Sequence, residues 1–356
     1  MAKAEFVHLA QVFNPDKHVI AGAFASQKLD GERAIWDGGI SRGFEACDVP
    51  YANSVKDFKR KRLQIATGLW SRTGKIIFAP DWFLDQLPPY PLDGELWAGV
   101  QNWQQLSSIV SQENPDDRWR LVEYKIIDSP PWRTLLQPRS IKVRNDYTFD
   151  VKRDALAWAQ DKIKDLGVMD HWSFEFVLRW LTKRIKTTGQ VSLVPQIELP
   201  FNNQKALEQV EGMARQVKDE GGEGVVIRKR TSLWLPERSW DLLKYKPQQD
   251  AEAVVVGYYA GRETDKGSKL LGMMGALEVS YQGSVFKMSG VTDHERQFSS
   301  GPAMEWARNH PGERCPDWIA NASFPVGASV TFRYRELSDD GTPKEARFLR
   351  KRQDGD

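Results

Sequence analysis

The last hundred residues of the chain alternate between short β-rich runs and turn residues, and this pattern constrains the fold more than any other feature. Branched and aromatic side chains dominate the runs, while small and polar turn residues separate them. The five runs are AEAVVVGYYAG, MGALEVSYQG, SVFKMSG, ASVTFRYREL and ARFLRKR. Five short strands in so few residues predict a small closed barrel, for which the OB fold is the natural candidate.

The preceding part of the chain has a mixed pattern. Short apolar runs occur beside two segments of helical periodicity, at residues 174–185 and 207–217. Residues 244–250, KYKPQQD, are polar, contain a proline and lack apolar periodicity, so they predict a hinge. We therefore predict an α+β chain with two domains, 1–247 and 248–356.

Composition limits where such a chain would work. With 356 residues it is long enough for two separate cores, and its formal net charge of +2 is small. The start, MAKAEFVHLA, lacks the features of a secretory signal, and no run of 18 apolar residues predicts a membrane span. The two cysteines, Cys47 and Cys315, are too few for a four-thiolate zinc site. We expect a reducing, cytoplasmic setting and no membrane partner.

Basic residues gather in three places. Residues 132–190 contain 12 basic and 7 acidic residues, residues 56–62 read KDFKRKR, and the chain nearly ends in RFLRKR. Such patches suit a polyanion, because each cation near a phosphate releases condensed counterions. A solvated charged surface explains any single patch equally well, so both interpretations stay open.

Lys28 lies in QKLDGERAIWDG, residues 27–38, beside a carboxylate, a tight turn and a second cation. A free lysine has a pKa of about 10.4, so a nucleophilic lysine needs burial or neighbouring positive charge. Arg33 is one such neighbour, and a bound metal would be another. Attack on a nucleotide α-phosphate would further need magnesium with positioned cations. Carboxylates would hold the metal or the ribose, and an aromatic ring would stack on the base.

Residues of these types follow in order along the chain. They are Arg72 in SRTGK (71–75), Glu95 in LDGELW (92–97), Tyr124 in VEYKIID (122–128), Glu223 in EGVVIRK (223–229), and Lys244 and Lys246 in LLKYKP (242–247). Each also has an ordinary explanation. Asp-Gly pairs usually form turns, glutamates are usually solvated, and a tyrosine in an alternating strand usually lies in the core.

The ordered series resembles the motifs of the covalent nucleotidyltransferases, and most of all the minimal two-domain ATP-dependent DNA ligases of phages, viruses and some bacteria. KLDGERAIWDG, followed by SRTGK, APDWF and LDGELWAG, is the most specific part, and the resemblance covers nearly the whole chain. It implies a nucleotidyltransferase (adenylation) domain of antiparallel sheets with flanking helices, followed by an OB-fold barrel. The implied activity is the sealing of 3′-OH/5′-phosphate nicks in duplex DNA through a lysyl-AMP and a DNA-adenylate. ATP and Mg²⁺ would be the cofactors, with Mn²⁺ as a substitute, and we expect a monomer in a bacterial or phage-infected cell.

The resemblance also implies roles for single residues. Lys28 would carry AMP as a phosphoramide, and Glu223 would support the divalent metal, with Asp30 and Glu95 as further candidates for the metal. Contacts with the nucleotide or a nick phosphate would come from Arg33, Arg72, Glu95 (on the ribose), Tyr124 (stacked on adenine), Lys244 and Lys246.

The C-terminal segment TPKEARFLRKRQD, residues 342–354, resembles the last motif of the family, which closes over ATP and orients the pyrophosphate. Arg347, Arg350 and Arg352 match its basic positions, and an arginine fork grips phosphate with two hydrogen bonds. Lys344 and Ala346 depart from the usual arginine and proline. An exposed basic terminus is the alternative interpretation of this segment.

Two stretches are longer than in the smallest relatives, at residues about 39–69 and 132–190. Our hypothesis is that one or both contact duplex DNA, and the alternative is a helical elaboration that only packs. An RNA ligase or an mRNA capping guanylyltransferase would share the lysine and several motifs. SRTGK argues against capping, and the OB-like end argues against an RNA ligase.

Overall fold

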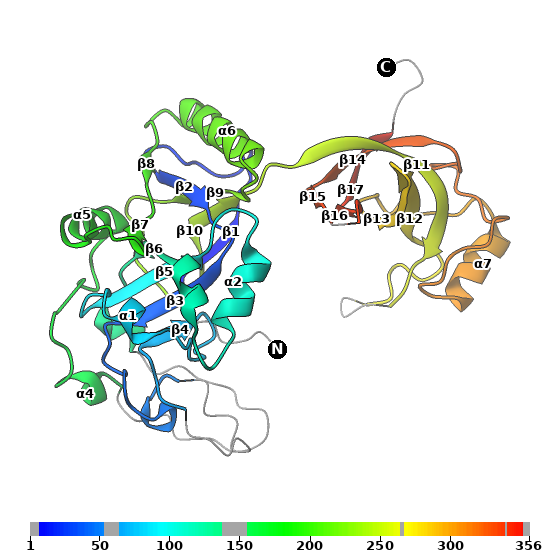
Figure 1. The fold of residues 1–356 in the computed structure, drawn as a ribbon. Coiled ribbons are helices and arrows are strands. Elements are labelled where there is room, and N and C mark those ends of the chain that lie inside the picture. Colours follow the sequence, from blue (N-terminus) through cyan, green and yellow to red (C-terminus); the bar gives the residue numbers. More distant parts are fainter. Residues whose placement is uncertain (1–6, 53–63, 137–154, 264–266, 339, 352–356) are drawn as a thin grey trace. The chain divides into compact units, whose positions relative to one another are not determined.

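The computed structural model describes residues 7–52, 64–136, 155–263, 267–338 and 340–351. The chain divides into two compact units, Met1–Lys246 and Pro247–Asp356, which Figure 1 colours from blue to yellow-green and from yellow to red. Parts of both longer stretches, together with Arg352, lie outside the described residues.

The first sheet of the N-terminal unit has the strand order β1-β10-β9-β2-β8. Its strands are β1 (Leu9–Val12), β10 (Arg238–Tyr245), β9 (Gly224–Arg228), β2 (Phe24–Lys28) and β8 (Ile197–Glu198). β1 runs parallel to β10, and the other neighbours are antiparallel. β2 is an inner strand, and its pairing with β9 places Lys28 opposite Gly224. Backbone hydrogen bonds therefore fix the strand that ends in the predicted nucleophile.

The second sheet has the order β4-β3-β5-β6-β7. Its strands are β4 (Leu69–Ser71), β3 (Glu32–Asp37), β5 (Pro91–Trp97), β6 (Glu123–Asp128) and β7 (Val191–Leu193). Side chains alternate across it, as the pleat requires. In β6, Tyr124 and Ile126 are buried while Lys125 and Ile127 are partly exposed. One face of this sheet therefore packs on a core and the other carries polar groups.

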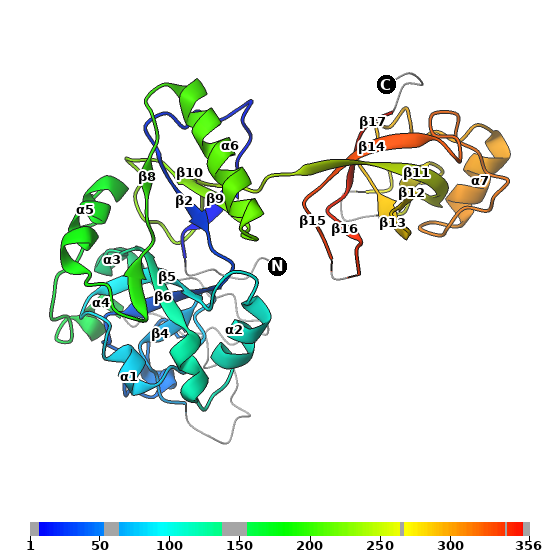
Figure 2. The same cartoon turned by 45° about the horizontal axis from the view of Figure 1, so that its top comes forward.

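Helices cover the outer faces of the two sheets. The largest, α6 (Asn203–Asp219), lies over β2 and β9, as Figure 2 shows. Its buried stripe packs on the first sheet, and the Asn202 side chain caps it by accepting a hydrogen bond from the Lys205 amide. The remaining helices are α1 (Asp81–Leu84), α2 (Trp103–Val110), α3 (Trp132–Leu135), α4 (Ala155–Ala159) and α5 (Phe174–Arg184), with 3-10 turns η1 (Ala46–Asp48) and η3 (Asp117–Leu121). The periodicity at residues 174–185 and 207–217 thus predicted α5 and α6 correctly.

The C-terminal unit contains a five-stranded sheet in the order β13-β12-β11-β14-β17. The strands are β11 (Gln249–Ala260), β12 (Met274–Tyr281), β13 (Ser284–Met288), β14 (Ser329–Tyr334) and β17 (Arg347–Lys351). A bridge between Ser289 and Arg347 joins the two edges, which closes the sheet into the predicted OB barrel. The sequence did not predict helix α7 (Gly301–Asn309) or the hairpin of β15 (Glu336–Leu337) and β16 (Pro343–Lys344).

Candidate active site

Lys28, Glu223 and Lys246 form one charge cluster where β2, β9 and β10 lie side by side. The Lys28 Nζ pairs with Glu223 Oε2, and the Lys246 Nζ lies 2.9 Å from Glu223 Oε1. Their side chains are 26%, 21% and 16% exposed, so the cluster is reachable from solvent. Burial alone would raise the pKa of Glu223, but the two ammonium groups hold it below its usual value. The predicted nucleophile, metal carboxylate and phosphate-binding lysine therefore meet at one point.

The turn after Lys28 fits tightly against β5. A Cβ on Gly31 would lie 2.2 Å from the carbonyl oxygen of Leu96 and 2.7 Å from Cγ of Glu95. No residue with a side chain fits there unless the turn moves, so glycine is required. The turn thereby fixes Lys28 of the first sheet next to Glu95 of the second.

Arg33 and Glu95 are direct cross-strand partners of β3 and β5. Nevertheless, the Arg33 guanidinium binds Asp93, which lies two residues before Glu95 on β5. The distances are 2.5 Å for Nε–Oδ1 and 2.9 Å for Nη2–Oδ2. Burial would lower the pKa of Arg33, but the charge and hydrogen bonds of Asp93 raise it above its ordinary value. Burial raises the pKa of Glu95 to about 7, although Arg33 and Lys28 oppose the shift. Within the described part of the chain, the Glu95 side chain makes no hydrogen bond or ion pair, which leaves its carboxylate for a ligand.

A second buried ion pair lies next to the first. Asp128, the cross-strand partner of Asp93, pairs with Arg228 of β9, and Arg228 Nε donates to Ser232 Oγ at 2.9 Å. The Arg228 guanidinium also lies 4.1 Å from the ring centre of Phe174. Carboxylate and guanidinium groups in equal number balance one another's charge there, which a buried charge requires.

The remaining predicted residues of the N-terminal unit lie around this centre. Arg72 is exposed in the turn after β4, and the pairing of Ala34 with Ser71 brings it beside Arg33. Asp30 is half-buried in the turn after Lys28. Lys244 lies on β10 opposite Val226, two residues before Lys246.

The prediction that Tyr124 stacks on adenine is wrong. Its side chain is 0% exposed, and its hydroxyl donates to the carbonyl oxygens of Ala34 at 3.0 Å and Leu92 at 3.1 Å. The ring lies on Gly94 and belongs to the core on the far side of the second sheet. The alternation of β6 could have shown this, since Tyr124 and Ile126 share one face.

Three residues near the site were not predicted from the sequence to take part in it. The neighbour of Tyr124, Lys125, places its Nζ 3.2 Å from Ser192 Oγ and 5.1 Å from the ring centre of Trp97. The Asp-Gly pattern predicted only a turn at Asp93, which instead lies on β5, is 0% exposed and binds Arg33. The third residue is Trp234, whose buried indole Nε1 donates a hydrogen bond to Asp93 Oδ2 at 2.7 Å. No motif contains Trp234, so nothing in the sequence could have linked it to Asp93.

The predicted arginines of the last motif belong to the C-terminal unit. Arg347 and Arg350 are exposed on β17, where they pair with Arg333 and Thr331 of β14. Their guanidinium groups are thus presented to solvent, as phosphate binding would require.

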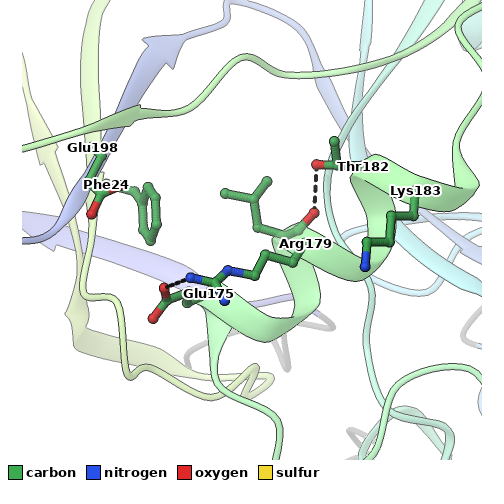
Figure 3. Close-up of a pocket in the computed structure, with 7 residues that line it drawn as sticks. Phe24, Glu175, Arg179, Thr182, Lys183 and Glu198 are labelled. Atoms are coloured by element: carbon green, nitrogen blue, oxygen red, sulfur yellow. Dashed lines mark hydrogen bonds and ion pairs between the residues drawn. The ribbon is translucent and has the colours of Figure 1, made fainter.

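A pocket of about 370 Å³ opens between α5, the first residue of β2 and the last residue of β8, as Figure 3 shows. The rings and chains of Phe24 and Leu178 give it an apolar part, and the Arg179–Glu175 ion pair of 2.7 Å borders it. Thr182, Lys183 and Glu198 complete the lining, which includes none of the predicted site residues.

The carboxylates near Lys28 are few. Among the described residues, no group of three or more His, Cys, Asp or Glu side chains could hold a metal ion by itself. Magnesium typically keeps several waters and binds one or two carboxylates together with substrate phosphates. Glu223 and the unpaired carboxylate of Glu95 fit that requirement, whereas a closed all-protein metal site does not fit.

The chain is similar to known proteins over nearly its full length. Residues 266–352 match the family model of the DNA ligase OB-like domain. A DNA ligase of Haemophilus influenzae is 22% identical over 334 residues, covering 94% of this chain and 88% of that protein. A solved structure from a study of DNA binding with a minimal scaffold in Lig E DNA ligases is 26% identical, with a TM-score of 0.56 and coverage of 97% and 98%. A further structure, Pmar-Lig_Pre, has a TM-score of 0.55 at 17% identity, covers 97% of this chain and 67% of its own, and supports the fold alone.

These likenesses confirm the resemblance and the fold class that the sequence predicted. None of the helices in the described ranges is long and apolar enough to cross a membrane.

Proposed function

We propose, from the premise that this chain is related throughout to the DNA ligases, that it seals 3′-OH/5′-phosphate nicks in duplex DNA with ATP. The observation that carries the proposal is the Lys28–Glu223–Lys246 cluster, which lies at the end of β2 beside Glu95. A DNA ligase OB-like domain follows in the same chain.

The first step joins AMP to Lys28. The Nζ leaves its pair with Glu223, loses one proton to solvent, attacks the α-phosphorus of ATP and releases a second proton to solvent as the phosphoramide forms. A phosphorus–nitrogen bond forms while the bond to the bridging oxygen breaks and pyrophosphate departs. A covalent intermediate of this kind divides one difficult reaction into easier ones. Lys246 and Lys244 would bring their charges to the phosphates, and positioned cations lower the barrier of such a transfer.

The other polar residues would hold the nucleotide and the nick. Glu95 would accept a hydrogen bond from the ribose, since its carboxylate has no partner among the described residues. Arg33 and Arg72, on neighbouring strands, would contact the nucleotide or the 5′-phosphate of the nick. Because Tyr124 is buried, it has no part in this proposal.

We propose Mg²⁺ as the metal, with Mn²⁺ as a substitute. Glu223 would support it, with Glu95 and Asp30 as further candidates. When bound, the ion would neutralise charge on the phosphates during transfer. The chain's own part is to hold two lysines and a carboxylate in one cluster, so that a cation can take the place of an ammonium group at Glu223.

The later steps use the same residues. AMP passes from Lys28 to the 5′-phosphate of the nick, and the 3′-hydroxyl then displaces AMP and closes the strand. Arg347, Arg350 and Arg352 would orient the departing pyrophosphate in the first step. We propose the domain boundary near residue 247 as the hinge through which the barrel changes its position between steps.

We propose that the enzyme acts as a monomer in the cytoplasm of a bacterial or phage-infected cell. The OB-like domain and the ligase relatives favour a DNA ligase over an RNA ligase or a capping guanylyltransferase.

The test is labelling by α-labelled ATP or GTP with magnesium, followed by sealing of a nicked duplex. We expect a labelled protein with ATP alone, no label in Lys28→Ala, and a sealed strand. The protein is first treated with pyrophosphate to remove AMP already bound. Labelling by GTP would indicate an mRNA capping guanylyltransferase. Labelling by ATP without sealing of the nicked DNA would indicate an RNA ligase. If neither nucleotide labels the protein, the role of Lys28 is wrong.

A further inference from the structure

Arg33 has two carboxylates within reach and binds the less obvious one. Glu95 lies directly opposite it across the β3–β5 pair, yet its guanidinium makes both hydrogen bonds with Asp93. Directly opposite charges on neighbouring strands ordinarily attract one another. Something must therefore favour Asp93 over Glu95 as the partner of Arg33.

The structure shows one additional donor at Asp93. Trp234 Nε1 donates to Asp93 Oδ2 at 2.7 Å, so that this oxygen accepts from both the indole and Arg33 Nη2. Trp234 is 4% exposed and Asp93 is 0% exposed. A hydrogen bond to a buried carboxylate is stronger than one in water and stabilises the charged form. The indole thus fixes the orientation of the Asp93 carboxylate.

The consequence appears at the open side of Arg33. With Nε and Nη2 bound to Asp93, Nη1 has no partner among the described residues, and the side chain keeps 20% of its surface exposed. Were Arg33 to bind Glu95 instead, one pairing would occupy both the cation and the carboxylate, and neither would be left for a ligand.

We propose that Trp234 is a positioning residue for the nucleotide step: its indole holds Asp93 so that Arg33 and Glu95 stay apart, each open to the nucleotide. This inference rests on the proposed function. Trp234 lies on the connection between β9 and β10, outside every motif, and reaches Asp93 across 141 residues of sequence. It touches no reacting atom in this scheme and acts only through Asp93.

The chain offers a matched control in Trp70. This indole is 0% exposed and belongs to the same core cluster as Trp234. Its Nε1 donates at 2.8 Å to Asp37, which is also fully buried and has no contact with Arg33 among its hydrogen bonds. Trp70→Phe and Trp234→Phe therefore remove the same kind of hydrogen bond and keep a similar ring.

The experiment measures the rate of AMP transfer to the purified full chain as a function of ATP concentration. For Trp234→Phe we expect the half-saturating ATP concentration to rise about tenfold, the effect of one lost hydrogen bond to a charged group. For Trp70→Phe we expect it to stay within about twofold of the unaltered chain. The midpoint temperature of thermal unfolding should fall by similar amounts in both variants, since both lose one buried hydrogen bond.

A double-mutant cycle with Asp93→Asn tests the route of the effect. If Trp234 acts through Asp93, Trp234→Phe should change the half-saturating concentration little in the Asp93→Asn background. Equal ATP dependence in Trp234→Phe and Trp70→Phe would overturn the inference, and so would fully additive effects in the cycle. An unaltered chain that takes no label would instead refute the proposed function, so the two failures are distinguishable.

Discussion

His8 should make the N-terminal unit sensitive to mild acid. The residue lies just before β1 and is 1% exposed, and neither ring nitrogen has a hydrogen-bond partner among the described residues. Burial lowers its pKa from 6.5 to about 3, and the nearby positive charges of Arg228 and Arg33 lower it in the same direction. The native state therefore contains a neutral imidazole next to two guanidinium groups.

The magnitude follows from the two pKa values. Between pH 6.5 and pH 3 the unfolded chain takes up a proton at His8 and the folded chain does not. Because the unfolded chain binds this proton and the folded chain does not, the free energy of unfolding decreases as pH falls. The decrease is about 1.4 kcal/mol per pH unit. From pH 7.5 to pH 5 the loss due to His8 is about 2 kcal/mol.

The assay compares the full chain with a His8→Leu variant by urea unfolding at pH 7.5, 6.5, 5.5 and 5.0. Both proteins share all other titrating groups, so the difference between their unfolding free energies isolates His8. That difference should move by about 2 kcal/mol in favour of the variant as pH falls. His171→Leu, which removes an exposed histidine, is the control and should follow the unaltered chain.

A difference that stays constant within about 0.5 kcal/mol across this range would refute the reasoning. It would mean that His8 is solvated or already charged in the folded protein. A shift of the opposite sign would mean that an anion pairs with the imidazole, which the described contacts do not show.

Three further predictions test the site. Gly31→Ala should slow AMP transfer at least about tenfold, because its Cβ would lie 2.2 Å from the Leu96 carbonyl, whereas Gly189→Ala, with open space around it, should have no effect. Tyr124→Phe should lower the free energy of unfolding by about 1 kcal/mol and leave the half-saturating ATP concentration unchanged, which labelling at graded ATP would check. Glu223→Gln should abolish most labelling at millimolar magnesium, and full activity in this variant would remove Glu223 from the proposed metal site.

Patterns within short stretches predicted much of the fold. The 3.6-residue period gave α5 and α6, and the run-and-turn pattern gave the five strands of the barrel, because both depend on neighbours in sequence. Helix α7 was not predicted; it lies in the segment between two of the β-rich runs. Tyr124 was misassigned because its place in a motif outweighed the alternation of β6, which puts it in the core.

The contacts that organise the site were beyond local patterns. The ion pairs Lys28–Glu223 and Arg228–Asp128, and the Trp234–Asp93 hydrogen bond, each join residues about a hundred or more positions apart. Residue type alone suggested that cations and carboxylates would meet. Which of them pair was decided by strand register and by burial, neither of which the sequence displays.

The strand register also makes Arg33 important for stability, so that a substitution of Arg33 cannot test its catalytic role alone. Asp93 and Asp128 are opposite one another on β5 and β6, where two like charges would repel. Arg33 and Arg228 supply one guanidinium to each, and both carboxylates are 0% exposed. Removing one partner of such a pair leaves a buried charge uncompensated, at a cost of about 3–5 kcal/mol. Arg33→Ala would therefore lose activity even if Arg33 never touched a nucleotide. Trp234→Phe avoids this problem, because both ion pairs keep all their charges while the orientation of one of them is released.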